Sequence, residues 1–232
     1  MGKDAKIKIT KNGPYLVSGD LPLDKQIIKI GKDNEPEKWI QGKRIPTPKI
    51  YSLCRCGKSK SKPFCDGTHN KVAFNGTETA NKKTFDEQSQ TINGSTLKLK
   101  DVIDLCAQTR FCHSGGGTWE LTRHSENQQK RNLAVKEATN CPSGRLVIVD
   151  KKTGKVIEKN LELSISLIED PQLNVSGPIW LKGGIPVESS DGSTYENRYR
   201  QTLCRCGKSE NKPFCKGNHV TAAFNDGDES LK

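Results

Sequence analysis

The sequence is short of apolar residues. Hydrophobic residues make up 32% of the 232 positions, aromatic residues only 6%, and methionine occurs once. The mean hydropathy is −0.73. A chain of this length allows one large domain, but two or three small domains are the more natural expectation for this composition. Small domains with thin cores are usually stabilised by disulfides or bound metal, and the nine cysteines could supply either.

Long hydrophobic runs are also missing. The segment MGKDAKIKITKNG (1–13) has no apolar signal core, and Lys6 stands where a myristoylation motif requires Ser or Thr. No window approaches a membrane span. We therefore expect a cytoplasmic protein with no membrane partner. Cytoplasmic thiols stay reduced and the number of cysteines is odd, so bound metal is the better interpretation.

A nucleic-acid motif is the third absence. The formal charge is +11, from 38 Lys and Arg against 27 Asp and Glu, and a basic chain can bind acidic partners. The charge is spread along the chain, however, with no basic helix and few aromatics. We interpret it as a solvated basic surface and expect no specific nucleic-acid partner.

The most informative feature present is a repeated string. CRCGKSKSKPFCDGTH stands at 54–69 and CRCGKSENKPFCKGNH at 204–219. Each string holds three cysteines and one histidine at the same offsets. The shared offsets indicate two copies of one ligand loop.

The flanks of the strings are repeated as well. Short glycine-broken strands are expected before them, at 12–23 and 176–187, and a single short strand after each, at 72–78 and 222–228. The first copy has about fourteen extra residues before its string. This insertion, around 31–45, predicts an extended loop or an extra hairpin.

The segment between the copies, about 95–170, has a different character. Its expected elements are a short helix at 99–108, a helix opened by a Ser125/Gln128 capping box and running to about Ala138, and a hairpin with strands 145–150 and 155–159. This segment therefore predicts a small α/β unit.

The predicted fold is α+β and β-rich. We expect a first cluster-binding module at 1–80, an α/β middle insert at 81–170 and a second module at 171–232. Each β module is too small for a core of its own. The two are therefore predicted to form an intramolecular pseudo-dimer, which makes the chain a monomer with an internal pseudo-twofold axis.

Both strings group their metal donors two and two. The donors are Cys54, Cys56, Cys65 and His69 in the first string and Cys204, Cys206, Cys215 and His219 in the second. The Cys-x-Cys pair lies on one tight loop, and the Cys and His four residues apart share one face of a helical turn. This grouping matches a [2Fe–2S] cluster, with two donors on each iron. A tetrahedral Cys₃His zinc site is the alternative.

The first string resembles the signature of CDGSH-type (NEET) iron–sulfur proteins, C-x-C-x₂-[ST]-x₃-P-x-C-D-G-[SAT]-H, at every specified position. The resemblance implies a [2Fe–2S] cluster with Cys54 and Cys56 on one iron and Cys65 and His69 on the other. Two such motifs around an insert resemble the single-chain pseudo-dimers of that family. The resemblance thus implies two [2Fe–2S] clusters.

The second string departs from the signature at Lys216 and Asn218. All four donors remain, so a second cluster is expected. Asp66 of the first string could cap the turn that carries His69, whereas a lysine cannot accept a hydrogen bond and opposes the helix dipole. Asn218 could compensate by local bonding. We predict that the second cluster is more labile or has a different potential.

The histidines are the expected functional donors. A neutral imidazole in place of a thiolate raises the reduction potential, and histidine titrates near neutral pH. We therefore expect His69 and His219 to set the redox and acid sensitivity of the clusters. Basic residues of the strings would offset cluster charge: Arg55, Lys58, Lys60, Lys62, Arg205, Lys208 and Lys212.

A second set of donors lies in the middle segment: Cys106, Cys112, His113 and Cys141. NCPSGRL (140–146) resembles the Cys-Pro end of ferredoxin motifs, but the Cys-x₂-Cys core and a fourth cysteine are missing. Buried free cysteine is the commoner fate of a reduced thiol. The sequence therefore does not decide whether these residues form a third metal site.

These features predict a protein with two [2Fe–2S] clusters that transfers electrons or clusters, with a redox protein or an apo-acceptor protein as partner. No nucleophile–base pair or dinucleotide fingerprint indicates an enzyme in its own right, although the chain could be a redox subunit of an oxidoreductase. The alternatives are a redox or pH sensor and a zinc-stapled protein-interaction module.

Overall fold

The computed structural model describes residues 5–231 and is β-rich, with few helices. Its first sheet has the order β12-β1-β2-β5. The strands are β1 (Lys6–Ile9), β2 (Tyr15–Ser18), β5 (Tyr51–Leu53) and β12 (Val187–Glu188). β1 reads KIKI and buries its two isoleucines, as expected of a strand with one face on the core.

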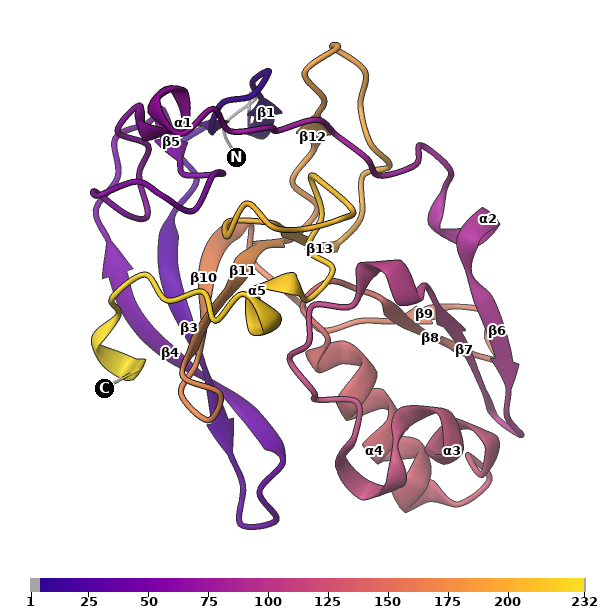
Figure 1. Cartoon of the computed structure of the whole chain (residues 1–232). Coiled ribbons are helices and arrows are strands. Elements are labelled where there is room, and N and C mark those ends of the chain that lie inside the picture. Colours follow the sequence, from indigo (N-terminus) through magenta and orange to yellow (C-terminus); the bar gives the residue numbers. More distant parts are fainter. Residues whose placement is uncertain (1–4, 232) are drawn as a thin grey trace.

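The second sheet has the order β13-β11-β10-β3-β4. Its strands are β3 (Leu23–Ile30), β4 (Pro36–Ile45), β10 (Ser164–Asp170), β11 (Val175–Lys182) and β13 (Arg200–Leu203). β3 and β4 form an antiparallel hairpin that extends away from the rest of the sheet (Figure 1). The predicted insertion at 31–45 is therefore an extra hairpin strand.

Each copy of the repeat gives one strand to the sheet of the other. β12 follows β11 in the second copy, yet it pairs in parallel with β1, with Ile7 opposite Val187. β3 follows β2 in the first copy, yet it pairs in parallel with β10, with Leu23 opposite Ile165. The two sheets bury one shared core, so neither copy completes its sheet or its core alone.

The middle segment forms a separate lobe with its own sheet, β6-β7-β8-β9, and two helices packed against it (Figure 1). The elements are β6 (Gln90–Asn93), β7 (Leu97–Asp101), α3 (Thr118–Arg123), α4 (Gln128–Asn140), β8 (Leu146–Asp150) and β9 (Val156–Ile157), and the short α2 (Phe85–Gln88) leads into them. In residues 5–231, no helix is long and apolar enough to cross a membrane.

Two predictions for this lobe are confirmed in outline. The hairpin at 145–159 exists as β8 and β9, with a shorter second strand than expected. The second helix exists as α4, but its predicted cap is wrong. The N-cap is Asn127, whose side chain accepts from the Gln129 and Lys130 amides at 3.0 and 3.1 Å. The Ser125 hydroxyl accepts instead from the amides of Thr96 and Leu97, at the start of β7.

Two other predictions are wrong. The helix expected at 99–108 is the end of β7 followed by a single 3₁₀ turn, Ile103–Leu105. The leucines of LKLKD alternate with lysines and are buried, which is the pattern of a strand. Pairing with β6 and β8 therefore favours a strand over the predicted helix. Within the described residues, 72–78 and 222–228 form no strand. Strand β10 pairs with β11, so the second sheet continues across the predicted boundary at 170.

Candidate metal centres

Each ligand string forms a loop between a strand and a short helix. In the first string the loop leaves β5 and ends in α1 (Thr68–Lys71), which carries His69. The Cys54 amide donates to the Pro63 carbonyl at 2.8 Å, and the Cys65 amide donates to the Ser52 carbonyl at 2.9 Å. These bonds fold the loop back on its own strand and bring its three cysteines to one end.

The second string repeats this construction between β13 and α5 (Asn218–Thr221). The Cys204 amide donates to Pro213 at 2.8 Å and the Cys215 amide to Thr202 at 2.9 Å. Ser209 donates to the Phe214 carbonyl at 2.6 Å, as Ser59 does to that of Phe64 at 2.7 Å. The serine hydroxyl shared by the two strings therefore closes each loop in the same way.

The donors meet in two pairs at each site. In the first site the Cys54 and Cys56 sulfurs lie 3.8 Å apart, and the Cys65 sulfur lies 3.3 Å from Nδ1 of His69. The corresponding distances in the second site are 3.7 and 3.5 Å. A tetrahedron with metal–sulfur bonds of about 2.3 Å has sulfur–sulfur edges of about 3.8 Å. Each pair thus has the spacing of two ligands on one metal ion.

The two pairs of a site do not converge on a single point. Among residues 5–231, no three histidine, cysteine or acidic donors of either string lie within 4.8 Å of one another. A single tetrahedral ion would need all four donors within about 4 Å of each other. The donor set therefore fits a group with two metal atoms.

The two loops touch each other back to back. A Cβ on Gly57 would lie 2.5 Å from the Cys206 carbonyl oxygen, and one on Gly207 would lie 2.5 Å from that of Cys56. Both glycines have positive φ, +74° and +76°. The backbones of the Cys-x-Cys segments are therefore in reciprocal contact, which only glycine permits.

The departure at Lys216 has a partner in the middle lobe. In the first site, Asp66 accepts from the amides of Lys60 and Thr68 at 2.8 and 3.0 Å; it therefore bonds the first amide of α1, although the N-cap position itself is Gly67 and not Asp66 as predicted. These bonds hold the pKa of Asp66 far below its usual value. Lys216 instead forms an ion pair of 2.9 Å with Asp104, in the 3₁₀ turn that follows β7.

The middle lobe covers the second site. A Cβ on Gly217 would meet the Gln108 side chain at 2.3 Å and the Cys106 carbonyl at 3.4 Å, and Asn211 donates to the Asp104 carbonyl at 2.9 Å. Asn218, expected to compensate for the lost aspartate, has a buried Oδ1 without a partner in the described chain.

The two sites consequently differ in exposure. Cys215 and His219 are only 3% and 4% exposed, whereas Cys65 and His69 are half-buried. Burial, and then the positive charge of Arg205, lowers the pKa of His219 to about 4. Burial argues against the expectation that the second cluster is the more labile one.

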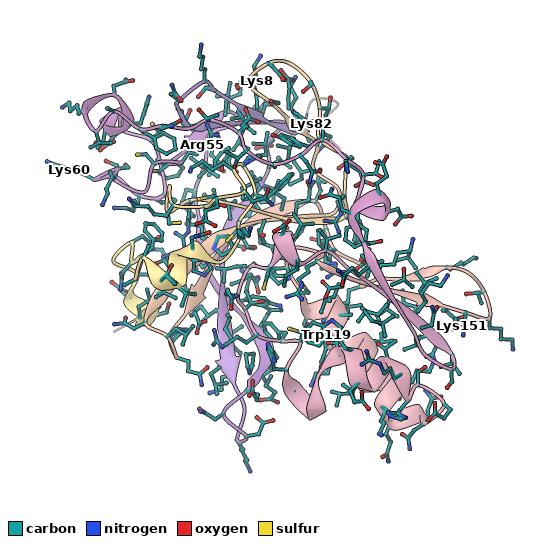
Figure 2. The ribbon with its side chains drawn as sticks, turned by 45° about the vertical axis from the view of Figure 1, so that its right-hand side comes forward. Lys8, Arg55, Lys60, Lys82, Trp119 and Lys151 are labelled. Atoms are coloured by element: carbon teal, nitrogen blue, oxygen red, sulfur yellow. The ribbon has the colours of Figure 1, made fainter. Side chains whose placement is uncertain are left out.

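The arginines between the paired cysteines also differ. Both are buried. Arg55 donates to the backbone carbonyls of Thr10 and Gly76. Arg205 is paired with Glu169, at 2.7 Å, and with Asp226. Two carboxylates therefore neutralise the second arginine, whereas the acceptors of the first are backbone carbonyls. Figure 2 shows Lys60 of the first string at the outer edge of the molecule.

Tyr15 is a residue of the second site that the ligand strings did not indicate. Its hydroxyl donates across to the carbonyls of Cys204 at 2.8 Å and Pro213 at 3.2 Å. The equivalent residue of the second copy is Ile179, and its side chain lines a small void beside Cys54 and Pro63. This tyrosine-to-isoleucine difference between the two copies is the sequence signal that marks Tyr15.

The three cysteines of the middle lobe are close enough to interact electrostatically. Burial, and then the charges of Cys141 and Cys106, raise the pKa of Cys112 to about 12. His113 is exposed, with its ring 6.1 Å from that of Trp119. The structure thus gathers the cysteines of this predicted set and leaves the histidine at the surface.

Comparison with protein-family models agrees with this geometry. The model described as "Iron-binding zinc finger CDGSH type" matches residues 12–70 and 176–220. The model described as "Divergent 4Fe-4S mono-cluster" matches residues 92–151, which span the three thiols. No curated protein and no solved structure matches the chain. With both ligand loops inside the first matches, the chain belongs to the CDGSH-type iron–sulfur proteins and carries two CDGSH motifs in one polypeptide.

Proposed function

We propose that the chain binds one [2Fe–2S] cluster at each CDGSH motif and acts in electron transfer or cluster transfer in the cytoplasm. The observation that carries the proposal is the grouping of donors into two separate pairs at each site, with spacings of 3.8 and 3.3 Å in the first. This spacing suits two irons better than one zinc ion.

Cys54 and Cys56 would hold one iron of the first cluster and Cys65 and His69 the other; Cys204, Cys206, Cys215 and His219 would do the same in the second. The imidazole donors give such a cluster a higher potential than four thiolates would. The residues around the donors fix the loops and exclude water from the second site. We infer no catalytic residues, and a redox protein or an apo-acceptor is the expected partner.

We also propose that the two copies form an intramolecular pseudo-dimer. Support comes from the reciprocal pairing of β12 with β1 and β3 with β10, and from the matching contacts of Gly57 and Gly207. Closed twofold contacts of this kind are self-complementary. They leave each module dependent on the other.

A third cluster in the middle lobe is a second proposal. Cys106, Cys112 and Cys141 lie within the matched 4Fe-4S region and interact electrostatically. Three thiolates leave one iron of a [4Fe–4S] cluster without a cysteine ligand. The donor set therefore fits such a cluster at three corners.

Metal analysis of ligand variants tests these assignments. The iron-loaded wild type should be red-brown, and Cys65→Ser and Cys215→Ser should each lose about two irons and two sulfides per chain. Cys112→Ser should leave both motif clusters in place and remove only iron bound by the middle lobe. A colourless wild type that contains two zinc ions would overturn the proposal.

Chelation should distinguish the two motif clusters. Because Cys65 and His69 are half-buried while His219 is 4% exposed, a ferrous chelator should remove the first cluster several-fold faster. Visible absorbance in Cys65→Ser and Cys215→Ser, each with one motif cluster, reports the separate rates. Equal rates, or faster loss from Cys65→Ser, would show that burial by the middle lobe does not protect the second site.

Two further measurements on the iron-loaded protein distinguish an electron carrier from a cluster donor. Reversible reduction without iron loss supports electron transfer, and appearance of a cluster on an apo-ferredoxin supports transfer.

A further inference from the structure

Most of the excess positive charge of the chain lies in the first copy of the repeat. Residues 1–80 contain 16 Lys and Arg against eight Asp and Glu, whereas residues 81–232 contain 22 against 19. The charge is therefore concentrated in one module and is not spread evenly along the chain as expected. A concentration of charge of one sign attracts partners of the opposite sign.

The first motif is also the more exposed of the two. Cys65 and His69 are half-buried, whereas Cys215 and His219 are 3% and 4% exposed beneath the middle lobe. The helix α1, which carries His69, lies on the side of the molecule away from α3 and α4 of that lobe (Figures 1 and 2). A protein that has to approach the metal donors can therefore reach those of the first motif directly.

Three exposed lysines belong to this part of the first motif. Lys58 and Lys60 stand in the ligand loop, and Lys71 ends α1. None of them forms an ion pair with another side chain in residues 5–231. The acid beside Lys60 is Asp66, whose oxygens accept from the amides of Lys60 and Thr68. Three unpaired ammonium groups therefore face solvent next to the half-buried donors.

The second string does not keep this charge. Glu210 stands at the position of Lys60, and Thr221 at the position of Lys71. The backbone and serine hydrogen bonds that fold the loop are nevertheless the same in both strings. The two lysines are therefore not needed to build the loop, and their presence only at the exposed site indicates a role outside it.

An exposed apolar side chain lies next to the lysines. Val72, which follows α1, is 48% exposed, and its equivalent in the second copy is Ala222. Protein interfaces combine apolar contacts of this kind with charged residues at the rim. Surfaces that bind single-stranded nucleic acid instead offer aromatic rings for stacking. The aromatic residues beside the ligands, Phe64 and Phe74, are half-buried with their rings already in contact with other side chains. The composition of this surface therefore favours a protein partner.

We propose that Lys58, Lys60, Lys71 and Val72 form a docking face for an acidic protein, beside the exposed donors of the first motif. Carboxylates of the partner meet the three unpaired ammonium groups, and an apolar side chain meets Val72. Complementary charge of this kind speeds association and fixes orientation. That the docked protein is a redox protein or an apo-acceptor rests on the proposed function. The docking face goes beyond that function, because it assigns the contact to one motif and gives the partner its charge.

Calorimetric titration of the iron-loaded full-length chain with an acidic, iron-loaded ferredoxin tests the docking face. We expect one ferredoxin per chain at low salt and weaker binding as the salt concentration rises. The double variant Lys60→Glu, Lys71→Thr gives the first motif the residues of the second, and it should weaken binding by about tenfold. Val72→Ser should weaken binding by about threefold at every salt concentration, because it removes an apolar contact.

The matched control exchanges residues between the motifs. It combines Lys60→Glu and Lys71→Thr with Glu210→Lys and Thr221→Lys. This exchange variant has the composition and net charge of the wild type. Its affinity should nevertheless stay about tenfold lower, because the middle lobe bonds Asn211 beside the new lysines.

Three results would contradict the docking face. Wild-type affinity in the exchange variant would show that net charge alone attracts the ferredoxin. Absence of ferredoxin binding at low salt would show that the face does not dock an acidic protein. Tighter binding of a thymidine oligonucleotide, with the same dependence on Lys60 and Lys71, would assign the face to nucleic acid.

Iron and sulfide content of the same samples separates the docking face from the proposed function. Ferredoxin binding by a chain that contains zinc in place of clusters would support the docking face and remove the cluster assignment. A chain that holds both motif clusters and does not bind ferredoxin would remove the docking face and leave the cluster assignment in place.

Discussion

Gly57→Ala should lower the free energy of unfolding by about 3 kcal/mol, combining about 1 kcal/mol for a non-glycine residue at positive φ with about 2 kcal/mol for overpacking. The added Cβ would lie 2.5 Å from the carbonyl oxygen of the metal donor Cys206, which is a backbone atom and cannot simply turn away, at a φ of +74°. Relief requires the two ligand loops to separate. The variant should therefore also loosen both clusters, although it removes no donor.

Gly154→Ala provides the matched control. Gly154 has a φ of +70° in the turn after β8, and a Cβ there would meet nothing within 4 Å. Only the conformational penalty of about 1 kcal/mol remains. Urea unfolding of both iron-loaded variants measures the difference, and Gly207→Ala should behave as Gly57→Ala because its contact with Cys56 is the reciprocal one. Equal losses in Gly57→Ala and Gly154→Ala would show that the loops separate at no cost.

Local sequence patterns predicted the elements whose contacts are made between residues close together in the sequence. The repeated strings predicted both ligand loops because all their donors lie within sixteen residues, and the β8–β9 hairpin followed from one turn between alternating apolar residues. The helix α4 was also recognised, but several residues suited its cap. Ser125 and Asn127 are both good caps, and the choice depends on Ser125 being drawn to the amides of Thr96 and Leu97.

Strand pairing between segments far apart in the chain could not be predicted from the sequence. Nothing local in β3 distinguishes pairing with its own copy from pairing with β10, because a buried strand can add to either sheet. The role of Lys216 was hidden for the same reason: its partner Asp104 belongs to another lobe, which also bonds Asn211 across 107 residues. For the segment 99–108, by contrast, the sequence did contain the signal for a strand. The apolar residues of LKLKD alternate with lysines, and this segment forms β7 instead of the predicted helix.

Arg205→Met should produce the other large effect, a loss of about 4 kcal/mol of unfolding free energy. Arg205 is 4% exposed and donates to Glu169, Asp226 and the carbonyls of Gly177 and Ile168. A methionine fills similar volume but leaves both carboxylates buried without their cation. Breaking one side of a buried ion pair typically costs about 3–5 kcal/mol.

Arg55→Met is the natural comparison because Arg55 occupies the same place between the cysteines of the first motif. Its acceptors are the backbone carbonyls of Thr10 and Gly76, so its removal strands no charge, and we expect a loss of about 1–3 kcal/mol. Adding Glu169→Gln and Asp226→Asn to Arg205→Met should recover part of the stability by removing the stranded carboxylates, and the same two changes should recover nothing in Arg55→Met. Urea midpoints of the iron-loaded proteins give the comparison. If the two arginine variants lose equal stability, and Glu169→Gln with Asp226→Asn rescues neither, the arginines act through packing alone. If these two changes rescue only Arg205→Met, the loss of stability comes from the buried carboxylates of Glu169 and Asp226 at the second motif.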